Sequence, residues 1–74
     1  MTCHERLRSL RVRNKLTQAS VASLIGIPQR TYSYYESGDR RIPLDHLAAL
    51  ARFYDCSLDY ISGASHVPRP YPEI

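Results

Sequence analysis

Long apolar runs are missing from this sequence of 74 residues. Tryptophan is absent, and there are only three glycines and two cysteines. No stretch approaches the ~18 consecutive apolar residues of a membrane-spanning helix, so nothing in the chain is expected to cross a membrane. The first residues, MTCHERLRSLRVR, lack the apolar segment of a signal peptide, and we therefore expect a cytoplasmic protein. A chain this short buries only somewhat over half of its unfolded surface, which allows one core and one domain.

Cysteine is too scarce and too scattered for a disulfide framework or a zinc site. Cys3 and Cys56 are expected to be reduced thiols, with Cys56 as a small core residue in an apolar context. A metal site would have to add His4, His46 and His66, and these form no C-x-x-C or H-x-x-x-H pair. The chain also lacks a nucleophile elbow, paired carboxylates and a phosphate-cradling loop. We therefore predict no metal, no cofactor and no enzyme activity.

Acidic residues are scarce in the first half of the chain. Residues 1–41 hold 8 Lys and Arg against 3 Asp and Glu, whereas residues 42–74 hold 2 against 4. The two halves carry formal charges of +5 and −2, which together make the net +3. A basic half suits a polyanionic partner, so the first half is the better candidate for a nucleic-acid surface. Charge of this size is equally consistent with a merely soluble surface.

Leucines at helical spacing predict an amphipathic helix over His4–Asn14. Leu7 and Leu10 are three residues apart on one side of this helix, and several arginines surround them. Arg6 and Arg8 are expected on the solvated side, where they act as solubilising charges.

The stretch Thr17–Gly38 predicts two short helices joined by a tight turn. The residues expected on their buried sides are Val21, Leu24 and Ile25 in the first, and Tyr32 and Tyr35 in the second. Thr17 is a suitable N-cap for the first helix, Gly26 can take the positive φ that ends it, and Pro28 presets φ where the second begins. Ala22, at the corner, is small enough to let the helices cross closely.

The other side of the second of these helices carries polar residues. They form two pairs one turn apart, Gln29 with Ser33 and Arg30 with Tyr34. All four side chains can form hydrogen bonds, and two of them are long enough to reach a base edge. A helix of this kind fits a DNA major groove.

Apolar residues dominate the segment after Ile42-Pro43 and predict a helix that forms the back wall of the core. They are Leu44, Leu47, Ala48, Leu50, Ala51, Phe53 and Tyr54. Ser57 is expected to cap a last short helix that stops at Gly63. Leu58 and Ile61, within that helix, are expected to close the core.

Prolines at every second position over Pro68–Pro72 favour an extended, polyproline-like tail over residues 64–74. The tail is either disordered or lies across a partner subunit, with Tyr71 and Ile74 as anchors. We therefore divide the chain into a folded domain, residues 1–63, and this tail.

The chain resembles the lambda-repressor-like, XRE-type family of helix-turn-helix regulators of bacteria and phage. Three segments within residues 5–63 carry the resemblance: LRSLRVRNKLTQ, ASLIGIPQRTYSYYESG and RRIPLDHLAALARFYDCSLDYISG. They follow the order and spacing of the family without a gap. The resemblance implies a compact, all-α fold of five helices, in which the second and third form the helix-turn-helix and the third lies in the major groove.

The resemblance also implies roles for particular residues. Base contacts are implied for Gln29, Arg30, Ser33 and Tyr34, and phosphate contacts for Thr17, Gln18, Ser37, Arg40 and Arg41. Arg11, beside the apolar side of the first helix, is implied to form a structural ion pair with Glu36 of the third. A contact with a second subunit is implied for Leu58, Tyr60 and Ile61 of the last helix and for Tyr71 of the tail. Tyr60 could equally be a plain surface tyrosine.

Two positions depart from the family pattern. Pro28 stands where a Ser or Thr N-cap is usual, so one phosphate-facing hydroxyl is missing. Tyr34 stands where Gln or Arg is common, and a phenol cannot form the two parallel hydrogen bonds to guanine that Arg forms.

We therefore expect a sequence-specific regulator of transcription that binds an inverted repeat in double-stranded DNA as a homodimer. A repressor that blocks the polymerase is the favoured interpretation, and the sequence also allows an activator that touches it. The alternative is an antitoxin or anti-regulator that has the same fold but neutralises an unknown protein partner, with the tail as the binding arm.

Overall fold

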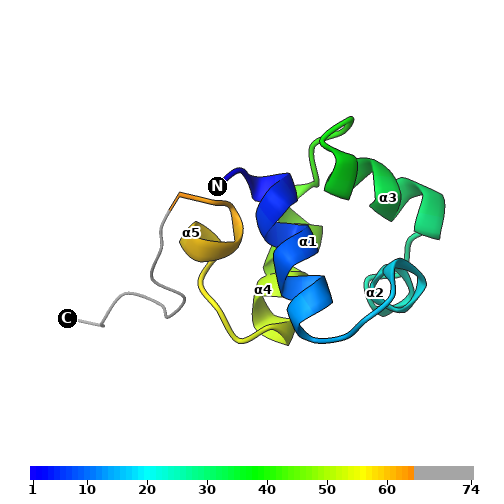
Figure 1. The fold of residues 1–74 in the computed structure, drawn as a ribbon, viewed down its shortest axis with the longest axis horizontal. Coiled ribbons are helices and arrows are strands. Elements are labelled where there is room, and N and C mark those ends of the chain that lie inside the picture. Colours follow the sequence, from blue (N-terminus) through cyan, green and yellow to red (C-terminus); the bar gives the residue numbers. More distant parts are fainter. Residues whose placement is uncertain (65–74) are drawn as a thin grey trace.

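Five helices follow one another in residues 1–64, the part of the chain that the computed structural model describes (Figure 1). They are α1 (Cys3–Arg13), α2 (Gln18–Leu24), α3 (Gln29–Ser37), α4 (Leu44–Phe53) and α5 (Leu58–Ile61). The expected all-α architecture is confirmed. None of the described helices combines the length and apolar character that a membrane crossing requires. The predicted tail, with Tyr71, falls outside the described residues beyond residue 64.

Hydroxyl side chains start three of these helices. The Thr2 hydroxyl accepts a hydrogen bond from the Glu5 N–H at 3.4 Å, and the Glu5 carboxylate accepts one from the Thr2 N–H at 2.9 Å. This reciprocal capping box begins α1 one residue earlier than predicted. Thr17 and Ser57 cap α2 and α5, each accepting from the N–H three residues further on, at 3.1 and 3.0 Å. Local sequence therefore sets where these helices begin.

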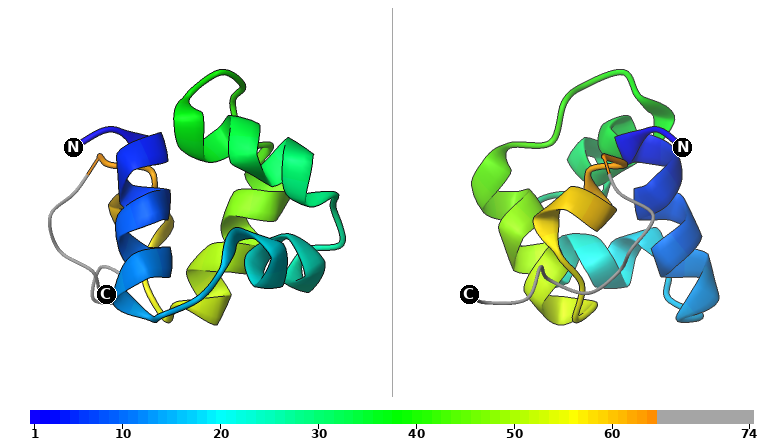
Figure 2. Two further views of the ribbon diagram at one scale, coloured as in Figure 1. Left: turned by 45° about the vertical axis from the view of Figure 1, so that its right-hand side comes forward. Right: turned by 90° about the vertical axis from the view of Figure 1, so that its left-hand side faces the viewer.

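The helices pack around α1, which contacts α3 on one side and α5 on the other. Figures 1 and 2 show α2 and α3 together on one side of the molecule and α5 beside the start of the chain, and in Figure 1 α4 lies behind α1. The side chains that fill the space between these helices are Leu7, Leu10, Val21, Ala22, Tyr32, Tyr35, Leu47, Leu50, Ala51, Tyr60 and Ile61. Every helix contributes to this core, so the orientation of α3 depends on all of them.

Four apolar residues that were expected in the core lie at the surface instead. Leu24, Leu44, Phe53 and Leu58 are exposed by 49%, 70%, 46% and 41%. A helix turns only one stripe of its surface toward its neighbours. In α2, Val21 and Ala22 occupy that stripe, and Leu24 faces solvent. The apolar stripes read from the sequence were therefore too wide.

Arg6 is the clearest correction to the sequence interpretation. Instead of a solvated charge it is a core residue, with 4% of its surface exposed. Its Nη1 donates to the Tyr60 carbonyl oxygen at 3.1 Å, and its Cζ lies 3.8 Å from the centre of the Tyr60 ring. An arginine can be buried where a carbonyl accepts its protons and an aromatic face meets its charge. Arg6 therefore fixes α5 against α1, whereas Arg8 is exposed as predicted.

Two glycines with similar backbone angles have different surroundings. Gly26, with φ +73°, has open space where a Cβ would be, whereas a Cβ at Gly63, with φ +87°, would lie 2.5 Å from the Met1 carbonyl oxygen. We expect Gly26→Ala to cost about 1–2 kcal/mol through φ alone. Gly63→Ala should cost a further ~1–3 kcal/mol, because the start of the chain must move. Chemical denaturation measures the free energy of unfolding of both variants. Equal decreases in the two would contradict a tight contact at Gly63.

Candidate nucleic-acid interface

A glycine turn sets the corner between α2 and α3. Gly26 takes φ +73°, and the Ile27 N–H donates back to the Ala22 carbonyl at 3.0 Å, which closes the end of α2. Pro28, extended at φ −63° and ψ 146°, starts α3 without a side-chain cap. Ala22 is 1% exposed inside the corner. The small side chain and the turn together place α3 across the end of α2.

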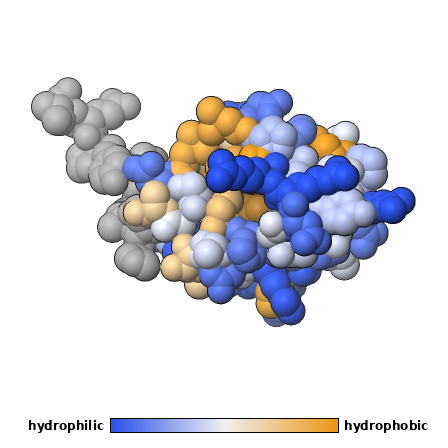
Figure 3. Space-filling model, turned by 90° about the horizontal axis from the view of Figure 1, so that it is seen from above, coloured by the Kyte–Doolittle hydropathy of each residue, from blue (hydrophilic) through white to orange (hydrophobic). Residues whose placement is uncertain are grey.

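The two sides of α3 differ sharply. Tyr32, Tyr35 and Glu36 face the interior and are buried. The four residues predicted to contact bases lie on the remaining surface: Gln29 and Arg30 are exposed, and Ser33 and Tyr34 are half-buried. Seen from the top of Figure 1, hydrophilic residues predominate toward the side of α2 and α3 (Figure 3). This side of α3 is therefore a polar ridge that solvent and a ligand can reach.

Tyr34 contacts a cation on each side of it. The Arg30 Nε donates to the Tyr34 hydroxyl oxygen at 3.3 Å. The guanidinium of Arg40, from the loop after α3, lies with its Cζ 4.7 Å from the centre of the Tyr34 ring. Sequence reasoning put these three residues on one surface but did not predict that they contact one another.

The residues predicted to contact phosphates fall into two groups. Arg40 and Arg41 are exposed cations in the loop after α3. The polar groups of the other three already have partners within the chain: Thr17 caps α2, Gln18 donates to the Glu36 carboxylate at 3.3 Å, and Ser37 donates to the Asp39 carboxylate at 2.9 Å. The two arginines are thus the cations most accessible to an anionic ligand on this loop.

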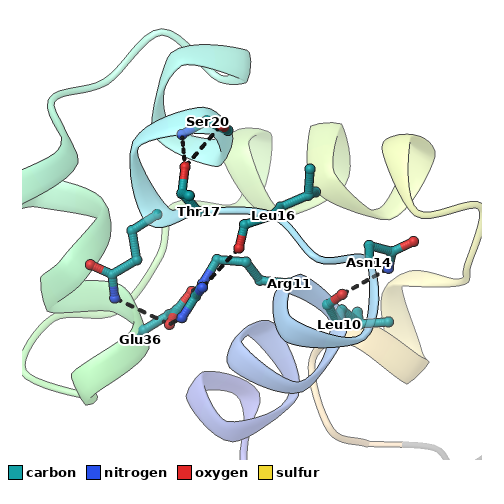
Figure 4. Close-up of polar contacts among 8 residues, drawn as sticks. Leu10, Arg11, Asn14, Leu16, Thr17, Ser20 and Glu36 are labelled. Atoms are coloured by element: carbon teal, nitrogen blue, oxygen red, sulfur yellow. Dashed lines mark hydrogen bonds and ion pairs between the residues drawn. The ribbon is translucent and has the colours of Figure 1, made fainter.

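An ion pair joins α1 to α3 behind this surface (Figure 4). The Arg11 Nε lies 2.7 Å from Glu36 Oε2, and Arg11 Nη2 lies 3.0 Å from Glu36 Oε1, so the contact is bidentate. Arg11 Nη1 also donates to the Leu16 carbonyl at 2.9 Å. With the hydrogen bond from Gln18 of α2, the Glu36 carboxylate connects three helices. The pair implied by the sequence is present, and it fixes α3 relative to α1 and α2.

The electrostatics of this pair follow from its partners. Burial opposes ionisation of Glu36, but hydrogen bonds to its carboxylate, that from Arg11 foremost, outweigh burial and hold the pKa of Glu36 below its ordinary value. The same hydrogen bond raises the pKa of Arg11. Burial raises the pKa of Tyr54 to about 12 and also raises that of Tyr32, and neither buried hydroxyl lies within hydrogen-bond geometry of a partner among residues 1–64. At neutral pH, Glu36 and Arg11 are both charged and the two phenols are neutral.

Two of the residues expected to contact a second subunit belong to the core. Tyr60 is 8% exposed and Ile61 is fully buried, so neither side chain can reach a partner in this conformation. The Arg6 guanidinium covers the Tyr60 ring, and Ile61 packs within the core cluster. Leu58, 41% exposed, is the one of the three that remains accessible on α5.

Residues 1–64 contain no cluster of three or more His, Cys, Asp or Glu side chains that could hold a metal ion. Cys3 and Cys56 are free thiols, and burial raises the pKa of both.

Comparison with known proteins identifies relatives for this arrangement. The model of a family described as helix-turn-helix matches residues 7–61. The chain is 46% identical over 69 residues to the uncharacterized HTH-type transcriptional regulator YobD of Bacillus subtilis, covering 93% of this chain and 62% of that protein. It is 36% identical over 69 residues to the HTH-type transcriptional regulator AnsR of the same organism, covering 93% and 60%. The chain thus spans about three fifths of the length of these relatives.

A solved structure adds a match in three dimensions. The P22 c2 repressor, crystallised in complex with a synthetic operator, superposes with a TM-score of 0.79 and 26% sequence identity. The match covers 88% of this chain and 98% of that one. The fold that holds the polar ridge of α3 is therefore shared with a repressor solved together with its operator.

Proposed function

We propose that this chain, which belongs to the XRE-type helix-turn-helix family, binds double-stranded DNA sequence-specifically and represses transcription in the cytoplasm. One observation carries the proposal. The helix α3 buries Tyr32, Tyr35 and Glu36 while its opposite side stays polar, and two exposed arginines follow it. A helix held in this way presents base-reading side chains to a major groove and cations to the flanking phosphates.

Direct readout would come from the start of α3. Arg30 can donate two parallel hydrogen bonds to guanine, and Gln29 can pair in the same way with adenine. Arg40 and Arg41 supply positive charge to the backbone and so set the position of the helix without reading sequence. The buried contact between Arg11 and Glu36 keeps α3 at a constant angle to the rest of the domain. A rigid reader of this kind loses little conformational freedom when it binds.

The bound form is a two-fold dimer on an inverted repeat. One module of this size contacts too few bases to select a site in a genome, whereas two modules multiply their specificity. Leu58, exposed on α5, is the described residue best placed to contact a second copy. Repression follows from occupancy, because a dimer bound over a promoter excludes other proteins from it.

Selection of bound sequences from random duplex DNA tests this function directly. An enriched motif with two-fold symmetry supports it, and it supplies the preferred site for every measurement below. A chain that enriches no motif would contradict it.

Replacing Arg30 with Ala is expected to weaken binding to the preferred site by about 1–3 kcal/mol and to relax preference at one base position. The reason is that Arg30 is exposed on the polar side of α3, where its guanidinium reaches a base edge. Titration of the preferred site and of its single-base variants measures both effects.

Arg41→Ala is the matched control, because it also removes one exposed arginine. This change should weaken binding to all sequences alike and reduce the slope of log affinity against log salt by about one. The assignment of roles is wrong if Arg30→Ala leaves base preference unchanged or if Arg41→Ala alters it.

A further inference from the structure

Tyr34 lies at the centre of the polar ridge, between two cations that come from different elements. Arg30 is one turn earlier on α3, and its Nε donates to the Tyr34 hydroxyl at 3.3 Å. Arg40 follows the end of the helix, and its guanidinium lies over the Tyr34 ring at 4.7 Å. The hydroxyl and the ring of Tyr34 thus each contact a different arginine.

The loop after α3 is folded so that Arg40 returns to this ring. Gly38 takes φ +84°, a left-handed conformation that reverses the chain at the end of the helix. The Arg40 N–H then donates to the Tyr34 carbonyl oxygen at 3.3 Å. The backbone of Arg40 is therefore fixed to the same residue that its side chain covers, so the stacked position does not depend on the side chain alone.

We propose that Tyr34 is a positioning residue, which orients Arg30 through its hydroxyl and Arg40 through its ring before DNA arrives. The proposal rests on the proposed function and deepens it. Tyr34 then does not act as a base reader in its own right. Its hydroxyl accepts from one arginine and one face of its ring is covered by the other, so that face cannot pack on a thymine methyl group.

The physical benefit lies in the order imposed on two flexible side chains. An exposed arginine loses rotamer freedom when it binds a base or a phosphate, and this loss opposes binding. A hydrogen bond and a cation–π contact that already restrict the arginines in the free chain reduce that loss. Each contact is exposed and weak, so each should change affinity by about two- to fivefold.

Double-mutant cycles on the whole 74-residue chain, with the preferred DNA site, separate positioning from direct contact. Tyr34→Phe keeps the ring and removes the hydroxyl, so it should weaken binding about two- to fivefold in the parent chain and have no effect in an Arg30→Ala background. Tyr34→Leu also removes the ring, and its additional loss should disappear in an Arg40→Ala background. Urea midpoints of all variants show that the fold is intact.

A second measurement needs no DNA. The Arg30 Nε–H should show restricted motion in nuclear magnetic resonance relaxation of the free chain, and Tyr34→Phe should release it. Exposed Arg41 serves as the reference for an unrestrained guanidinium in both variants.

The outcomes distinguish the possible roles of Tyr34. If Tyr34→Phe reduces affinity equally in the parent chain and in the Arg30→Ala background, the hydroxyl touches DNA itself, and the proposal is overturned. An Arg30 Nε–H that is as mobile in the parent chain as in Tyr34→Phe would overturn it too. A parent chain that binds every duplex equally refutes the proposed function, whereas a selective parent without these couplings refutes only the role of Tyr34.

Discussion

Replacing Glu36 with Gln is expected to lower the free energy of unfolding by about 3–5 kcal/mol, because it leaves the charge of Arg11 without its partner inside the protein. The Glu36 side chain is 4% exposed and that of Arg11 is 15% exposed. The lost carboxylate also accepts the hydrogen bond from Gln18, so contacts between α3 and two other helices weaken together. Domains of this size are stabilised by only about 5–15 kcal/mol in total, so the change should be large in urea denaturation.

Asp39→Asn provides the matched control. Asp39 is exposed in the loop after α3, and its carboxylate accepts a hydrogen bond from Ser37 at 2.9 Å. The change removes the same charge without removing a buried pair, so the urea midpoint should move little. Equal midpoints for the two variants would contradict the stabilising role of the pair of Arg11 and Glu36.

The stability of the parent chain should also fall in acid through Glu36. Its pKa lies below the ordinary value of 4.5 in the folded chain. The unfolded chain therefore binds the proton more readily, and stability decreases as the pH falls from 4.5 through the lower folded pKa. Glu36→Gln has no such proton to bind, so its stability should depend less on pH in this range. The urea midpoints of the parent chain and of Glu36→Gln are compared from pH 6 down into the acid range where both chains still fold. If the two midpoints fall with pH in parallel, the lowered pKa of Glu36 is contradicted.

Insertion of about five base pairs, half a helical turn, between the half-sites of the proposed inverted repeat is expected to reduce affinity by about 10²–10⁴-fold, towards that of a single half-site. Two recognition helices related by a two-fold axis must enter successive major grooves on one side of the duplex, about 10 base pairs or ~34 Å apart. Half a turn places the second half-site on the opposite side, where the second copy of α3 cannot reach it. Titration of the symmetric and the spaced duplex measures the difference.

A change at Leu58 tests whether the loss of affinity for the spaced duplex reflects a lost contact between the two copies. Leu58→Gln should weaken binding to the symmetric site and leave the spaced site unchanged, because the contact between copies is already lost there. Leu44→Gln alters another exposed leucine, 70% exposed on α4, and should leave the ratio of the two affinities as it is in the parent. A parent chain that binds the symmetric and the spaced site equally well would refute the dimer.

Much of the candidate interface could be placed on one helix from the sequence, since its residues are neighbours in sequence. Gln29 with Ser33 and Arg30 with Tyr34 form two neighbouring pairs four residues apart, so any helix over that stretch places all four on one side. The contact of Arg40 with the Tyr34 ring was not predictable in the same way. It depends on the reversal of the chain at Gly38, which brings the loop back over the helix.

The positions of the helices follow from local sequence, because a cap such as Thr17, a stop such as Gly26 and the fixed φ of Pro28 act within a few residues. Which side chains are buried depends instead on how the helices pack. Leu24 is exposed and Arg6 is in the core, against their hydropathy. Burial depends on which helices pack together: a leucine with no facing helix stays in solvent, whereas an arginine that meets a carbonyl and an aromatic ring from a distant segment can leave it.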